Sequence, residues 1–152
     1  MNKERILALI DTLRALPPER FSHSTWFDVP DYDNICGSTA CIAGWCALAN
    51  NLGDPIYKNI GGMDVCVGFE RESKLEIIVG EYLGLSKYEV AVLFFPFDLA
   101  GEHMELYQGV PESDVNDFGE LITVPYASLN EAINMLERGL ERGTFTLSMW
   151  FE

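Results

Sequence analysis

Apolar residues along the chain recur at two spacings, which together predict several helices and a small β element. From Lys3 to Leu16 they return every three or four positions, and Pro17 follows, so a first helix is expected there. Between 55 and 69 the spacing changes to two short β-prone runs that flank Gly61-Gly62, a typical hairpin signal. The chain therefore begins with a helix and contains a hairpin near its middle.

Later helices are indicated by their end signals. A helix from Ser73 to Leu83 is followed by Gly84, which suits the residue after a helix end. The patterns Ser86-x-x-Glu89 and Ser128-x-x-Glu131 are capping boxes that open two further helices. The second of these helices extends to Arg142, and a shorter apolar periodicity predicts another helix at 113–122.

At the end of the chain, the apolar residues at 144–151 alternate with period two, which predicts a strand that could add to the 55–69 hairpin. The expected fold class is α+β and predominantly α-helical. It comprises one domain over 1–152, with about five helices, the hairpin at 55–69 and the C-terminal strand.

Composition sets the broad class. A chain of 152 residues with 48% hydrophobic residues can bury a core without disulfides. No stretch reaches the roughly 18 to 20 apolar residues that span a bilayer. The first 16 residues carry Asp11 and Arg14 within their apolar run, which is unlike a secretory signal. A cytoplasmic, reducing location without membrane contact is expected, and the four cysteines are then thiols.

Charge is distributed unevenly. The net charge is −14, and from Tyr88 to Glu137 there are ten acidic residues but no Lys or Arg. Such a surface repels phosphates, so direct binding to nucleic acid is disfavoured. The acids either serve solubility or form a face that docks on a basic protein surface. The candidate docking residues are Asp98, Glu102, Glu105, Asp114 and Asp117.

The stretch CGSTACIAGWCALANN at 36–51 predicts a helix from Thr39 to Asn50 with one small-residue face, capped by Ser38 or Thr39. Its spacing of C-x4-C-x4-C differs from the closer pairs that structural zinc prefers, and two cysteines five apart on a helix point about 140° apart. No metal site and no cofactor is predicted.

A second interpretation of the same stretch is a cysteine hydrolase. Cys36 at a helix mouth could have a stabilised thiolate, with His23 as its base, and Cys41 is the other candidate nucleophile. The papain-like pattern C-G-[SA]-C-[WY] is not reproduced, because Thr39 stands at the nucleophile position.

A small anionic, nucleotide-like ligand is a further candidate. It would lie between aromatic rings and be held by nearby cations. The aromatic candidates are Trp26, Trp45 and Tyr82, and the basic ones are Arg20, Arg71 and Lys74.

The chain resembles a loose family of small uncharacterised proteins of phages and bacteria. The resemblance rests on an aromatic segment ending at Trp26, on the run from Cys36 to Trp45 (C-G-[ST]-x-x-C-x-A-G-[WH]), on Leu83-Gly84-Leu85-Ser86 with a following Leu-Phe, and on a C-terminal helix ending near Gly143. Cys46 stands where that family usually has Ala, and the 55–69 segment departs from it. The resemblance implies a phage or mobile-element origin and no established activity.

These observations lead to one main expectation. The protein is expected to be a phage-type accessory binder that sequesters or inhibits a host component, either a protein with a basic surface or a small ligand. A cysteine-dependent hydrolase and a structural phage component are the alternatives, and the oligomeric state is left open.

Overall fold

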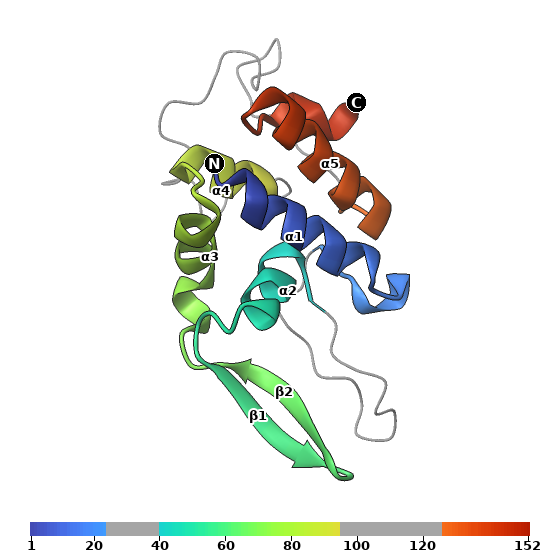
Figure 1. The fold of residues 1–152 in the computed structure, drawn as a ribbon, viewed down its shortest axis with the longest axis vertical. Coiled ribbons are helices and arrows are strands. Elements are labelled where there is room, and N and C mark those ends of the chain that lie inside the picture. The colour runs from blue at the N-terminus through green and yellow to red at the C-terminus, as the bar shows by residue number, and fades with distance from the viewer. Residues whose placement is uncertain (24–39, 95–125) are drawn as a thin grey trace.

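A computed structural model of the chain describes residues 1–23, 40–94 and 126–152. Across these ranges the fold is mainly helical α+β, as the sequence predicts, with five α-helices and one two-stranded antiparallel sheet (Figure 1). The α-helices are α1 (Lys3–Arg14), α2 (Ile42–Ala49), α3 (Leu75–Leu83), α4 (Lys87–Phe94) and α5 (Leu129–Arg142). The strands are β1 (Pro55–Ile60) and β2 (Met63–Phe69), and the short 3₁₀ helices are η1 (Pro18–Arg20), η2 (Glu72–Lys74) and η5 (Leu147–Phe151). The helix predicted at 113–122 lies outside the described residues.

Both predicted capping boxes are confirmed. The Ser128 hydroxyl accepts a hydrogen bond from the Glu131 amide at 3.3 Å, and Glu131 Oε2 accepts one from the Ser128 amide at 2.7 Å. Ser86 and Glu89 exchange the same pair of bonds at 3.2 and 2.9 Å. These bonds satisfy amides that a helix N-terminus leaves unpaired, so each helix starts where its sequence signal lies.

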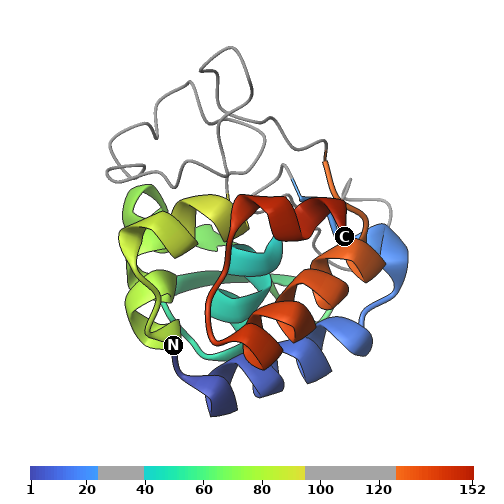
Figure 2. The same ribbon diagram turned by 90° about the horizontal axis from the view of Figure 1, so that it is seen from above.

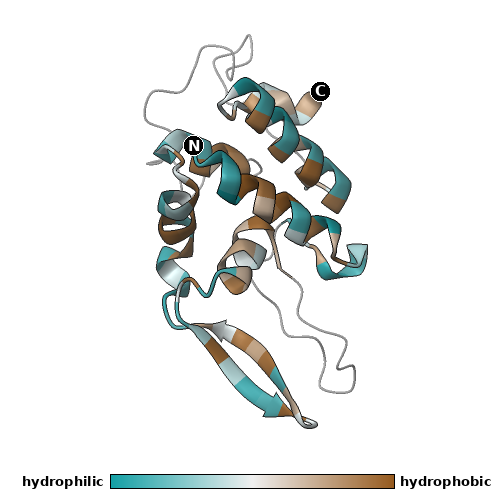
Figure 3. Ribbon diagram, viewed as in Figure 1, coloured by the Kyte–Doolittle hydropathy of each residue, from teal (hydrophilic) through white to brown (hydrophobic). Residues whose placement is uncertain are grey.

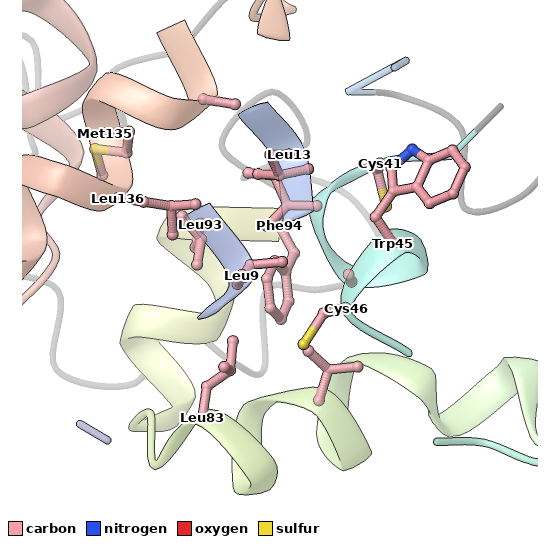
Figure 4. Packing of buried hydrophobic residues seen from close by; sticks show 14 of the residues in the cluster. Leu9, Leu13, Cys41, Trp45, Cys46, Leu83, Leu93, Phe94, Met135 and Leu136 are labelled. Carbon is pink, nitrogen blue, oxygen red and sulfur yellow. The ribbon is translucent and has the colours of Figure 1, made fainter. Parts of the chain in front are cut away.

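The core lies where the five helices meet. Helix α1 packs against α5, α2 and α3, and lies between α5 and α2 in Figure 1. Figure 4 shows side chains from every helix converging on this region. The labelled residues are Leu9, Leu13, Cys41, Trp45, Cys46, Leu83, Leu93, Phe94, Met135 and Leu136. The core of the described residues is therefore organised around α1 and α2 rather than around the sheet.

Helix α2 begins later than predicted. Ala40 forms a parallel bridge with Phe21, in which the Ala40 amide donates to Arg20 O at 3.2 Å and Ala40 O accepts from the Ser22 amide at 3.1 Å. The backbone at Ala40 is therefore extended, and Cys41 becomes the N-cap of a helix that starts at Ile42. The predicted caps Ser38 and Thr39 lie outside the described residues.

The predicted hairpin at 55–69 is confirmed. Gly61 and Gly62 both have positive φ, at 61° and 86°, which a two-residue turn of the type that matches strand twist requires. A bulge displaces the register between Ile56 and Tyr57, which face Gly68 and Cys66 respectively. The hairpin projects away from the helices (Figure 1), and apolar residues lie along its strands as well as in the helical core (Figure 3).

The C-terminal strand predicted at 144–151 is wrong, because the segment forms the 3₁₀ helix η5. The predicted alternation describes burial at Phe145, Leu147 and Met149, which are all fully buried, but not at Phe151, which is 56% exposed. The three buried residues pack onto α5 instead of onto a sheet, and the Phe145 ring lies where Gly139 leaves room for it. In Figure 2 this segment runs back along α5, and in Figure 1 it lies at the opposite end of the molecule from the hairpin.

Candidate functional site

The structure places Cys41 at the start of α2, where it is the N-cap residue. Hydrogen bonds from the amides of Ala43 and Gly44 lower its pKa, as the helix N-terminus predicts. Burial outweighs them and raises the pKa to about 11. Cys41 is therefore a protonated thiol at neutral pH, the form less suited to nucleophilic attack. Cys36 lies outside the described residues.

The two remaining described cysteines are buried as well. Burial raises the pKa of Cys46 to about 12, and it also raises the pKa of Cys66. Cys46 faces the core between α2 and α3 (Figure 4), while the Cys66 thiol donates to Gly68 O at 3.3 Å within the hairpin. In the described part of the chain, no three His, Cys, Asp or Glu side chains group closely enough to hold a metal ion.

His23 is buried and holds two distant segments together. Its Nδ1 accepts a hydrogen bond from the Ala127 amide at 2.9 Å, and its ring lies 5.0 Å from that of Trp150. Burial lowers the pKa of His23 to about 4, against smaller opposite effects of the Leu93 backbone and the Glu131 charge. The imidazole is therefore neutral at pH 7, and its position between the Phe21 segment and the start of α5 serves packing.

The two described aromatic candidates each stack with a different arginine. The Arg20 guanidinium lies 4.9 Å from the Trp45 ring centre, and the indole N–H donates to Arg20 O at 3.0 Å. Arg5 lies 4.1 Å from the centre of the Tyr82 ring, whose hydroxyl donates to Asn50 Oδ1 at 2.8 Å. Both rings thus engage neighbours within the protein, through separate cation–π contacts.

The other basic candidates, Arg71 and Lys74, are exposed at the two ends of η2, next to the base of the hairpin. Trp26 and the five acidic candidates Asp98, Glu102, Glu105, Asp114 and Asp117 lie outside the described residues.

A cavity that the sequence reasoning missed lies between α5 and η5. Its volume is about 330 Å³. The lining residues are Glu131, Asn134, Arg138, Trp150, Phe151 and Glu152. Glu131, Asn134 and Arg138 are three and four residues apart, so they share one face of α5. The helical spacing of these three polar residues is visible in the sequence. The cavity itself is not, because it forms only where η5 packs opposite this face of α5.

Several contacts fix the shape of this cavity. The Trp150 indole N–H donates to Val92 O at 2.8 Å, and Arg138 Nη1 donates to Met149 O at 2.8 Å. Arg142 binds both carboxylate oxygens of Glu152 at 2.5 and 2.6 Å, so these two charges cancel locally. Hydrogen bonds from Ser128 lower the pKa of Glu131, which keeps this carboxylate ionised at neutral pH.

Comparisons with family models, with curated proteins and with solved structures find no match to this chain. Over the described ranges, no helix is both long and apolar enough to cross a membrane.

Proposed function

We propose that the protein is a small acidic accessory protein, of the kind that phages encode, which binds a host protein through a basic surface of that partner and thereby sequesters or inhibits it. The carrying observation is the separation of charge along the chain. The described ranges contain all ten basic residues and 14 of the 24 acidic ones. Segments 24–39 and 95–125 contain the other ten acids and no Lys or Arg.

The use of the arginines supports the proposal. Arg14 pairs with Glu137, Arg142 pairs with Glu152, and Arg138 binds a backbone carbonyl. Arg5 and Arg20 stack on aromatic rings. Five of the six arginines of the described ranges are thus engaged within the fold, and segments 24–39 and 95–125 contain no Lys or Arg that could neutralise their acids. An excess of one charge steers an oppositely charged partner and sets the rate of association.

The test compares two variants with the same change in charge. In the first, Asp98→Asn, Glu102→Gln and Glu105→Gln neutralise three candidate docking residues. In the second, Glu70→Gln, Glu72→Gln and Glu81→Gln neutralise three exposed acids of the described body. Each protein is immobilised, bacterial lysate is passed over it, retained proteins are identified, and the binding of each purified protein is then measured between 50 and 500 mM NaCl.

We expect a basic protein to be retained at low salt, with affinity that falls steeply as salt rises. The first variant should lose at least about tenfold in affinity, while the second should bind as the unchanged protein does. Equal losses in both variants would mean that total charge alone acts, and would refute a specific acidic face. A screen that retains no basic protein at any salt concentration would refute the proposed function itself.

A further inference from the structure

The cavity between α5 and η5 contains polar atoms that the fold does not use. One carboxylate oxygen of Glu131, Oε2, accepts both the amide and the hydroxyl of Ser128, at 2.7 Å each. The structure gives the other oxygen, and the Asn134 amide, no hydrogen bond to a described residue. Glu131 and Asn134 both line the cavity, so a carboxylate and an amide with remaining hydrogen-bonding capacity border it.

Two aromatic side chains line the same cavity. The Trp150 ring is held by its bond to Val92 O and by the His23 ring, while Phe151 is 56% exposed. A rigid indole beside an exposed phenyl ring is a favourable surface for a cation, because the face of each ring is electron-rich. Trp150 of η5 and Glu131 of α5 line the same cavity, and both interact with His23: the Trp150 ring lies 5.0 Å from the imidazole, and the Glu131 charge raises its pKa slightly.

The basic residue that lines the cavity, Arg138, lies at the opposite end from Glu131. Arg138 follows Glu131 by seven residues, which places their Cα atoms about 10 Å apart along the helix axis. Its Nη1 is directed to Met149 O. The Arg142–Glu152 pair adds no net charge. A positively charged group can therefore occupy the Glu131 end without close contact with Arg138.

We propose that this cavity receives an arginine side chain of the partner protein, an inference that rests on the proposed function and names the partner residue that anchors it. The guanidinium would stack on Trp150 and Phe151 and donate hydrogen bonds to Glu131 and Asn134. Arginine fits better than lysine because its planar group stacks and donates several hydrogen bonds at fixed angles. A volume of about 330 Å³ is at the small end of ligand pockets, which suits one side chain.

The test uses a peptide pair that differs by a single charge. The probes are acetyl-Gly-Arg-Gly-amide and the same peptide with citrulline, which keeps the shape of arginine but is neutral. Binding in 150 mM NaCl is followed through the NMR signal of the Trp150 indole N–H. We expect the arginine peptide to bind at least about tenfold more tightly than the citrulline peptide.

Glu131→Gln should reduce that preference to less than threefold, and it retains an N3 residue that can complete the capping box. Glu141→Gln, an exposed acid near the end of the same helix, is the matched control and should leave the preference unchanged. If both peptides bind alike, or both variants behave alike, the arginine site is refuted.

The two proposals fail separately. The peptide measurement needs no host protein, so its failure removes the anchor while the salt-dependent partner can still stand. If a basic partner is found, Glu131→Gln should weaken it at least about fivefold; a partner that is lost only in the Asp98, Glu102 and Glu105 variant would uphold the acidic face and refute the cavity as its anchor.

Discussion

Helix α2 and the hairpin formed by β1 and β2 are both rich in apolar residues, yet their burial is opposite. Every residue of α2 from Ile42 to Ala47 is buried. In the hairpin, Tyr57 and Met63 are 51% and 57% exposed, and only Cys66 and Phe69 are buried. Apolar content alone therefore does not decide which segment enters the core.

Neighbouring elements account for the difference. Helix α2 is anchored at its start by the Phe21–Ala40 bridge and by the bond from Trp45 to Arg20 O, and its small residues let α1 and α3 approach. The hairpin has only its own two strands, and the bulge turns Cys66 to the side on which Phe69 is buried. A two-stranded hairpin has little stability of its own, so its connection to the body at Phe69 supports it.

The comparison between the helical core and the hairpin predicts that the largest loss of stability follows a substitution at Phe145, in the core. The ring is fully buried against Gly139 of α5. Phe145→Ala removes most of a large side chain and leaves a cavity, so the free energy of unfolding should fall by about 4 kcal/mol. Urea unfolding followed by tryptophan fluorescence measures this, because Trp45 and Trp150 both lie in the helical body.

Gly139→Ala is the companion variant. A Cβ at this position meets the Phe145 ring, so the single change should cost about 2 kcal/mol through overpacking. In the Phe145→Ala background the same change should cost nothing or stabilise, since the obstacle is gone and Ala favours the helix. Additive costs in the double variant would show that the two residues are not packed against each other.

A smaller effect, dependent on pH, is expected at His23. Its native pKa of about 4 is below its ordinary value of 6.5, because the buried site disfavours the charged form. As the pH falls from 6.5 to 4, the unfolded chain takes up a proton that the folded chain does not. The free energy of unfolding should therefore fall by about 3 kcal/mol over this window. The stabilising contribution of neutral His23 is fully present above pH 6.5 and is lost as the pH falls to 4.

His23→Gln removes the titrating group, and its amide oxygen can still accept the Ala127 N–H bond. Its stability should be nearly independent of pH between 4.5 and 6.5. Glu131 and Glu152 do not blur this window, because their native pKa values are lowered and they lose their contribution only as the pH falls through 4.5 and below. An unchanged slope in the variant would show that His23 is not buried in its neutral form.

Local signals explain how much of the fold was predictable. The capping boxes at Ser86 and Ser128, and the Gly61-Gly62 turn, each involve residues at most three apart, so the sequence contains the whole interaction. The start of α2 depends on Phe21 pairing with Ala40, and η5 depends on Gly139 making room for Phe145. Such long-range contacts are not visible in a pattern of apolar residues, which is why the pattern predicts too early a start for α2 and a strand where η5 forms.

The candidate site also depends on long-range contacts that the sequence does not show. Residue type predicts the thiol, imidazole and aromatic candidates, but burial decides the protonation of Cys41 and His23. Residue type does not single out the cavity residues Asn134, Arg138 and Trp150, because each is ordinary in its own segment. Only the return of the chain along α5 brings them together.

The smallest change in stability is expected at Tyr57, an aromatic residue that is exposed in the hairpin where Phe145 is buried in the helical core. Tyr57 is an aromatic residue of β1, opposite Cys66 in the register but half exposed. Tyr57→Thr keeps a strand-favouring residue, so global stability should change by less than about 0.5 kcal/mol in the same urea experiment. Amide hydrogen exchange should nevertheless become faster in β1 and β2 alone, because the hairpin can open without the helices. A loss of 1 kcal/mol or more would mean that the hairpin belongs to the cooperative core, and would remove the contrast with α2.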